Sequence, residues 1–83
     1  MFLTVKQKIL ITLLETGPLQ NSDIAKLVGI TEQWCSEIIN ILYAKGLIES
    51  EFIRPRRINK LTERGVEIAR RLKEVSENLT NQT

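Results

Sequence analysis

The spacing of apolar residues predicts two helices in the first third of the chain. Thr4, followed three residues later by a Gln, has the chemistry of a capping box, and apolar residues at helical spacing continue the helix over 4–16. A shorter helix begins at Gln20 or Asn21, of which Asn21 is the better cap by side-chain chemistry. Gly29 ends it, because glycine adopts a positive φ at little cost.

A third helix is predicted from about residue 32 to residue 45. Thr31 is a strong N-cap, and Gly46 ends the helix. Its apolar residues recur at i, i+3, i+4 and i+7, which is typical of one buried face. That face consists of Cys35, Ile38, Ile39 and Leu42.

The rest of the chain predicts a β-hairpin followed by a last helix. The β-branched content and partial alternation of residues 47–53 predict a strand, and 57–61 form the returning strand. The turn between them is expected at 54–57, with Pro55 in its second position. Thr62 caps a helix that continues to about residue 79. The apolar seam of that helix consists of Ile68, Leu72, Val75 and Leu79.

The order helix, helix, helix, strand, strand, helix predicts a mainly α fold with a small β-hairpin. Two helices that meet across the three-residue turn 29–31 are typical of a helix-turn-helix. A hairpin directly afterwards makes such a unit winged. We therefore expect a winged helix-turn-helix.

Composition argues for one small domain without catalytic machinery. The chain has 83 residues, one cysteine and no histidine, so neither a disulfide framework nor a Cys-rich zinc module is expected. The commonest general base and metal ligand is missing, and there is no Gly-rich phosphate loop or activated nucleophile. We expect no enzyme, no cofactor and no metal. No apolar stretch is long enough for a membrane span and no signal peptide is apparent, so a cytoplasmic protein is expected.

The net charge of +2 is concentrated in one segment. Residues 54–60, at the predicted hairpin turn and the strand after it, carry four cations and no acid. Such a cluster is either an electrostatic footprint for phosphate groups or a solvated loop. Its cations are Arg54, Arg56, Arg57 and Lys60.

Over about residues 5–75 the chain resembles MarR-type winged helix-turn-helix transcription regulators and their small archaeal and viral relatives. The resemblance implies that the chain binds double-stranded DNA as a homodimer, with a recognition helix at 31–45 and a wing at 49–61. One departure is that this helix has no Lys or Arg before its last residue and carries Glu32 and Glu37. The segments that carry the resemblance are Val28-Gly29-Ile30-Thr31, then Cys35, Ile39 and Leu42, then Lys45-Gly46-Leu47-Ile48-Glu49, and Leu61-Thr62-Glu63-Arg64-Gly65.

The polar face of the predicted recognition helix has suitable chemistry for reading base edges. Gln and Asn pair with adenine, and Glu accepts from the N4 amino group of cytosine. The alternative is an ordinary polar helix surface, and Trp34 either contacts DNA or packs on the flank of the helix. The predicted contacts are Thr31, Gln33, Trp34, Ser36, Glu37 and Asn40 on the helix, with Arg54, Arg56, Arg57 and Lys60 on the wing.

These expectations divide the chain into a DNA-binding domain at 1–61, a dimerisation helix at 62–79 and a frayed tail at 80–83. The seam of the last helix either folds onto its own domain or pairs with the same helix of a second copy; pairing is expected. A different function remains open, namely a protein-interaction adaptor of the transcription or replication machinery. The weak net charge and the two glutamates of the third helix favour it. No effector ligand is predicted.

Overall fold

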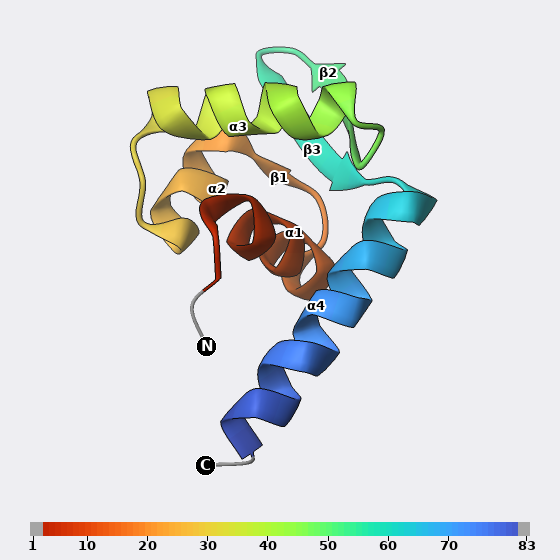
Figure 1. Cartoon of the computed structure of the whole chain (residues 1–83). Coiled ribbons are helices and arrows are strands. Elements are labelled where there is room, and N and C mark those ends of the chain that lie inside the picture. Colours follow the sequence, from red (N-terminus) through yellow and green to blue (C-terminus); the bar gives the residue numbers. More distant parts are fainter. Residues whose placement is uncertain (1–2, 82–83) are drawn as a thin grey trace.

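The computed structural model describes residues 3–81, with side chains up to residue 78. It has four helices and a three-stranded antiparallel sheet, so the predicted winged-helix fold is confirmed (Figure 1). The elements are α1 (Val5–Thr16), β1 (Leu19–Gln20), α2 (Asn21–Val28), α3 (Glu32–Ala44), β2 (Ile48–Ile53), β3 (Arg56–Leu61) and α4 (Glu63–Asn81).

Capping explains where most helices begin and end. Thr4 and Gln7 form the predicted capping box at the start of α1, and the Thr31 hydroxyl accepts from the backbone N–H of Trp34 at the start of α3. The prediction that Asn21 caps α2 is wrong. Gln20 is the N-cap without a side-chain bond, and Asn21 is the first helical residue. The Asn21 amide instead bonds to side chains on other elements.

The predicted hairpin is part of a larger sheet in which β3 lies between β1 and β2. Leu19 pairs with Asn59, so the short β1 adds a strand that the sequence analysis missed. Ile53 pairs with Arg56, which leaves only two residues in the loop. Pro55 is therefore the third residue of the turn, after a cis peptide bond, and not the second as predicted.

The hydrophobic core lies where α1, α2, α3 and the start of β2 meet. Three of the four residues predicted for the inward face of α3 are buried, and Ile38 packs against the core from its edge. Each helix thus buries one face and leaves the other exposed. The buried hydrophobic residues are Ile9, Leu10, Leu13, Ile24, Ala25, Cys35, Ile39, Leu42, Leu47, Ile48 and Ala69.

The beginning of α4 is held firmly against the domain. The Thr62 hydroxyl accepts from the backbone N–H of Gly65 and donates to the carbonyl of Gly46, as expected for the predicted cap. Farther along, α4 packs against α1, and its last turns extend past the other helices (Figure 1). Among the described residues, no helix is both long and apolar enough to span a membrane.

Candidate nucleic-acid interface

The outer face of α3 presents polar side chains to solvent. Gln33, Glu37 and Asn40 are exposed, on the side of the helix opposite its buried residues. Thr31 is also exposed, although its hydroxyl is engaged in capping. Ser36 is half-buried, and its Oγ accepts a hydrogen bond from the Asn21 side chain at 3.0 Å. Five of the six predicted helix contacts, Trp34 among them, are therefore exposed.

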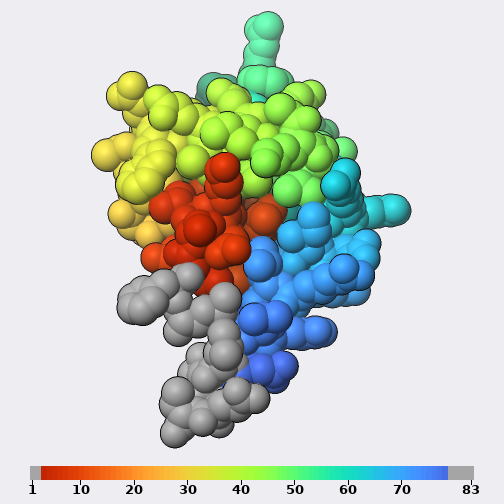
Figure 2. Space-filling view, viewed as in Figure 1, coloured from red at the N-terminus to blue at the C-terminus, as the bar shows by residue number. Residues whose placement is uncertain are grey.

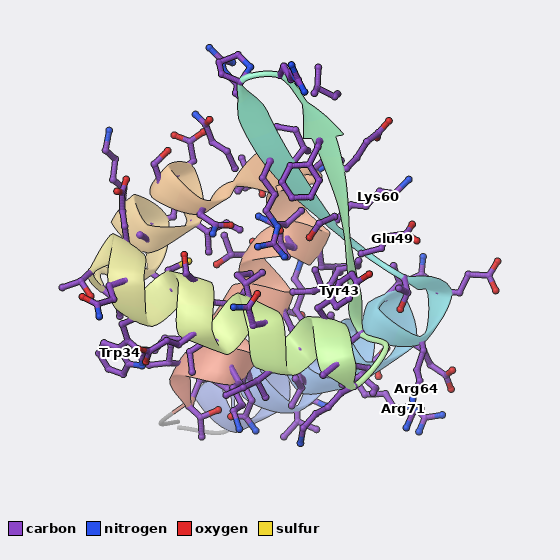
Figure 3. All side chains as sticks on the ribbon, turned by 90° about the horizontal axis from the view of Figure 1, so that it is seen from above. Trp34, Tyr43, Glu49, Lys60, Arg64 and Arg71 are labelled. Carbon is purple, nitrogen blue, oxygen red and sulfur yellow. The ribbon has the colours of Figure 1, made fainter. Side chains whose placement is uncertain are left out.

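Trp34 lies on the flank of α3, with 46% of its surface exposed (Figure 3). Two other large side chains of this helix, Ile41 and Tyr43, are also exposed. The indole of Trp34 is therefore available to a binding partner. The rest of its surface is covered, so an exposed edge of the indole and packing on the flank of the helix occur together.

The wing consists of β2, its two-residue loop and β3, and its four predicted cations differ in their surroundings. Arg54 and Arg56 are exposed at the tip. Arg57 is half-buried, and its guanidinium lies 5.7 Å from the centre of the Phe52 ring, within the range of a cation–π contact. Lys60 forms an ion pair with Glu49 on the neighbouring strand, with 3.4 Å between Nζ and Oε1. Three of the four cations therefore remain without a carboxylate partner among the described residues.

The outer face of α3 and the wing lie on the same side of the molecule. Both lie at the top of the molecule in Figure 1, and from above α3 crosses the lower part of the view while the hairpin extends beyond it (Figure 3). The wing tip projects beyond the other elements in the space-filling view (Figure 2). Between α3 and the wing is a polar hollow of about 260 Å³. It is lined by Gln20, Asn21, Ser22, Glu32, Ser36, Pro55, Arg56 and Arg57.

Arg57, one of the residues that line this hollow, carries a polar atom without a partner. The Arg57 Nε is buried and forms no hydrogen bond within the described part of the chain. A buried donor without an acceptor is unfavourable by about 1–3 kcal/mol, so an acceptor from a ligand or from water would be favourable here. The guanidinium is also held by Phe52, which limits the entropy that it would lose on binding.

Cys35 is fully buried behind this surface, as its place in the apolar stripe predicts. Burial raises the pKa of its thiol, and the nearby carboxylate of Glu32 raises it further. The thiol is therefore protonated near neutral pH and packs as a small apolar side chain. No group of three or more potential metal ligands occurs among the described side chains.

The four residues predicted for dimerisation do not form one exposed seam. Ile68 and Leu72 pack against the core of their own domain, and only Val75 is largely exposed, at 47%. The side chain of Leu79 lies outside the described residues. The first half of the seam therefore follows the alternative in which α4 folds onto its own domain.

Two residues that the sequence did not assign to the interface lie directly below it. Asn59 is the one fully buried polar residue of the described chain, and Asn21 joins it to α3. The predicted pairing of the two hairpin strands could have indicated that Asn59 is buried. This pairing places Asn59 opposite Ser50 on the same face as Ile48, which is buried.

Comparison with known proteins supports this assignment of elements. The family profile described as winged helix-turn-helix DNA-binding matches residues 3–49, from before α1 to the start of β2. No curated protein sequence matches the chain.

Solved structures match over almost the whole chain. ZitR of Lactococcus lactis has a TM-score of 0.88 and 22% identity, over 94% of this chain and 61% of its own. A MarR family transcriptional regulator from Silicibacter pomeroyi has a TM-score of 0.86 and 21% identity, over 96% and 59%. A transcriptional regulator homologue from Pyrococcus horikoshii has a TM-score of 0.78 and 26% identity, over 94% and 81%. The fold is thus that of MarR-type regulators, while the chain spans about three fifths of the first two proteins.

Proposed function

The chain belongs to the winged helix-turn-helix DNA-binding family, and from that premise we propose that it is a transcription regulator that binds specific sites on double-stranded DNA as a homodimer. In this proposal α3 enters the major groove and the wing contacts the backbone or the minor groove. Its place of action would be the cytoplasm.

One observation carries the proposal, namely that α3, with its exposed polar face, and the wing, with Arg54 and Arg56 exposed at its tip, lie at the same end of the molecule and line a common hollow (Figure 1). On that face Gln33 and Asn40 have the amide chemistry that pairs with adenine, and Glu37 would accept from the amino group of cytosine. Sequence reading would thus depend on α3, although this helix has no cation before its C-cap.

The wing would supply affinity that does not depend on sequence. Arg54, Arg56 and Arg57 have no carboxylate partner among the described residues, whereas Lys60 is paired with Glu49. Three arginines in each of two wings give six cations for phosphate groups. Six phosphate contacts predict that log K falls with log salt at a slope of about −5.

A second copy would place two recognition helices about 34 Å apart, on a pseudo-palindromic site. The support for pairing comes from the end of α4. Its last turns extend past the domain and Val75 is exposed there, while Ile68 and Leu72 already pack within the chain (Figure 1). Pairing would therefore involve the C-terminal half of α4.

The test is selection of bound duplexes from a random pool, followed by titrations of variants on the selected duplex and on a scrambled one. We expect Gln33→Ala and Asn40→Ala to change sequence preference, by about 1–3 kcal/mol for a contacted base. Arg56→Ala should weaken both duplexes equally and flatten the salt dependence. If all three variants behave identically, these roles for α3 and the wing are wrong.

A second candidate, a protein-interaction adaptor, is favoured by one observation. Phe52 and Ile53, adjacent residues of the wing, are 76% and 56% exposed, and Trp34 on α3 is 46% exposed. Large apolar side chains exposed in this way are available to a partner protein. If the protein fails to bind random duplex at low salt and a partner protein is recovered in a pull-down, this candidate replaces the first.

A further inference from the structure

A continuous chain of partly buried side-chain hydrogen bonds connects the wing to α3. It begins at Ser50 of β2, whose Oγ donates to the Oδ1 of Asn59 in β3 at 2.8 Å. The Nδ2 of Asn59 donates to the Oδ1 of Asn21 in α2. The Nδ2 of Asn21 in turn donates to the Oγ of Ser36 in α3 at 3.0 Å. Four side chains thus join four elements.

Asn59 is the centre of this chain. It is 0% exposed, in a position where the neighbouring inward residues of the sheet, Ile48 and Leu61, are apolar. Its amide is fully used, because Nδ2 also donates to the backbone carbonyl of Leu19 at 3.3 Å. A buried amide contributes little net stability over an apolar residue of similar size. Its directional bonds, however, specify one arrangement of β3 relative to α2.

The position of these hydrogen bonds lets them influence the direction of the wing tip. Ser50 and Asn59 pair with each other midway along the wing, and every residue from 51 to 56 is exposed. The direction of the exposed tip therefore depends on how the strands are held at this pair. Arg56 is three residues from Asn59, or about 10 Å at the usual rise of a strand. A small rotation at Asn59 is thus amplified at the arginines.

We propose that Asn59 and Asn21 are positioning residues that hold the wing at a fixed angle to the recognition helix, so that the arginines and the base-reading face of α3 bind one DNA site together. This inference rests on the proposed function for its consequence, since a fixed angle matters only if both surfaces contact the same duplex. Loss of the hydrogen bonds of Asn59 and Asn21 would keep the face of α3 and the arginines of the wing, but would no longer fix the angle between them.

Asn21→Ala is the most informative variant. It removes the bonds to Asn59 and Ser36, while Asn59 keeps its bonds to Ser50 and Leu19. Asn21 is half-buried and lines the hollow between α3 and the wing, so its truncation opens space next to that hollow and not in the closed core. Ser36→Ala, which removes only the last bond, serves as a second variant if Asn21→Ala fails to fold. Ile9→Val in the core is the matched control, because it lowers stability without touching the chain of bonds.

The first measurement is independent of DNA. Spin labels on Arg54→Cys and Glu37→Cys, in a Cys35→Ala background diluted with unlabelled protein, report the distance between wing tip and α3. We expect a narrow distance distribution that Asn21→Ala broadens and Ile9→Val leaves unchanged. An unchanged distribution in both Asn21→Ala and Ser36→Ala would overturn the proposal.

The second measurement is the ratio of affinities for the selected duplex and a scrambled duplex. We expect this ratio to fall by about fivefold or more in Asn21→Ala, within the usual range of coupling between two sites, with little change for scrambled DNA. An equal fall in Ile9→Val would show that only stability matters. If the native protein binds neither duplex, the proposed function fails, while the spin-label distances still decide whether Asn21 positions the wing.

Discussion

Gly65 sets how closely α4 approaches the sheet. A Cβ at this position would lie 2.1 Å from the carbonyl oxygen of Leu47 and 3.2 Å from the Cδ2 of Leu61. The same Leu47 carbonyl accepts from the backbone N–H of Thr62, so it is not free to move. The contact is between backbones, and no change of rotamer relieves it.

We therefore expect Gly65→Ala to lower the free energy of unfolding by about 1–3 kcal/mol, the usual effect of overpacking. Urea denaturation followed by far-UV circular dichroism measures it. Arg64→Ala, on the neighbouring exposed residue, is the control and should change stability by less than about 0.5 kcal/mol. Equal effects of the two variants would contradict the close approach.

Cys35 makes stability depend on pH in the alkaline range. Its pKa in the folded protein lies above the ordinary value of 9.0, first because of burial and then because of Glu32. Above pH 9 the unfolded chain therefore loses the thiol proton first, and this favours unfolding. The contribution of the thiol is complete below that pH and declines as pH rises toward the folded pKa.

We expect the free energy of unfolding of the native protein to fall more steeply between pH 8 and pH 10 than that of Cys35→Ala. The difference in slope should not exceed about 1.4 kcal/mol per pH unit, the limit for one proton. Urea titrations of both proteins in reductant measure it. Parallel pH profiles would show that the thiol titrates normally.

Among the elements, the wing shows that strand pairing decides which of its cations have a carboxylate partner. Lys60 lies directly opposite Glu49 in the β2–β3 pairing and is neutralised by it, whereas Arg56 lies opposite Ile53 at the tip. The four cations of residues 54–60 are close in sequence, but Lys60 is therefore less available to a partner than the arginines are. We expect Arg56→Ala in a dimer to reduce the salt slope of DNA binding by about 2, since two phosphate contacts are lost.

Lys60→Ala should change the salt slope of DNA binding by much less than Arg56→Ala, because Lys60 is already paired with Glu49. Glu49→Gln should strengthen DNA binding at low salt, because it leaves Lys60 without that partner. Fluorescence anisotropy titrations on one duplex at several salt concentrations compare the three variants. Equal changes of slope in Arg56→Ala and Lys60→Ala would refute this division.

The elements differ in how well the sequence predicted them. The four helices were predicted within a few residues, because caps such as Thr4, Thr31 and Thr62 mark their starts and apolar residues repeat at helical spacing. The strand β1 was missed because two residues have no periodicity, and Leu19 pairs with a residue 40 positions away. The cap of α2 was assigned incorrectly because the Asn21 side chain accepts a hydrogen bond from Asn59 and does not cap its own helix.

At the scale of the whole molecule, the open question is how α4 meets a second copy. The chain itself covers Ile68 and Leu72, so Val75 is the exposed apolar position that the described part of the seam leaves for pairing. In a symmetric dimer one substitution removes two buried side chains. At about 1.5 kcal/mol each, Val75→Glu is expected to raise the dimer dissociation constant by about 100-fold or more.

Sedimentation equilibrium on the native protein and on Val75→Glu measures this change. Glu74→Gln, a substitution at the neighbouring exposed residue, is the control and should leave the association unchanged. If the native protein is a dimer that Val75→Glu does not weaken, pairing uses another surface than the end of α4.

The linear pattern was enough to predict the four helices, the hairpin, the inward faces and the concentration of cations near the hairpin. These depend on interactions within about four residues, namely capping bonds and helical periodicity, which a linear pattern records. The strand β1, the ion pair of Lys60 and the folding of α4 onto its own domain depend on tertiary contacts. The series of side-chain hydrogen bonds from Ser50 to Ser36 also depends on tertiary contacts. Its bonds join residues 9, 38 and 15 positions apart, and such contacts exist only after packing has brought the elements together.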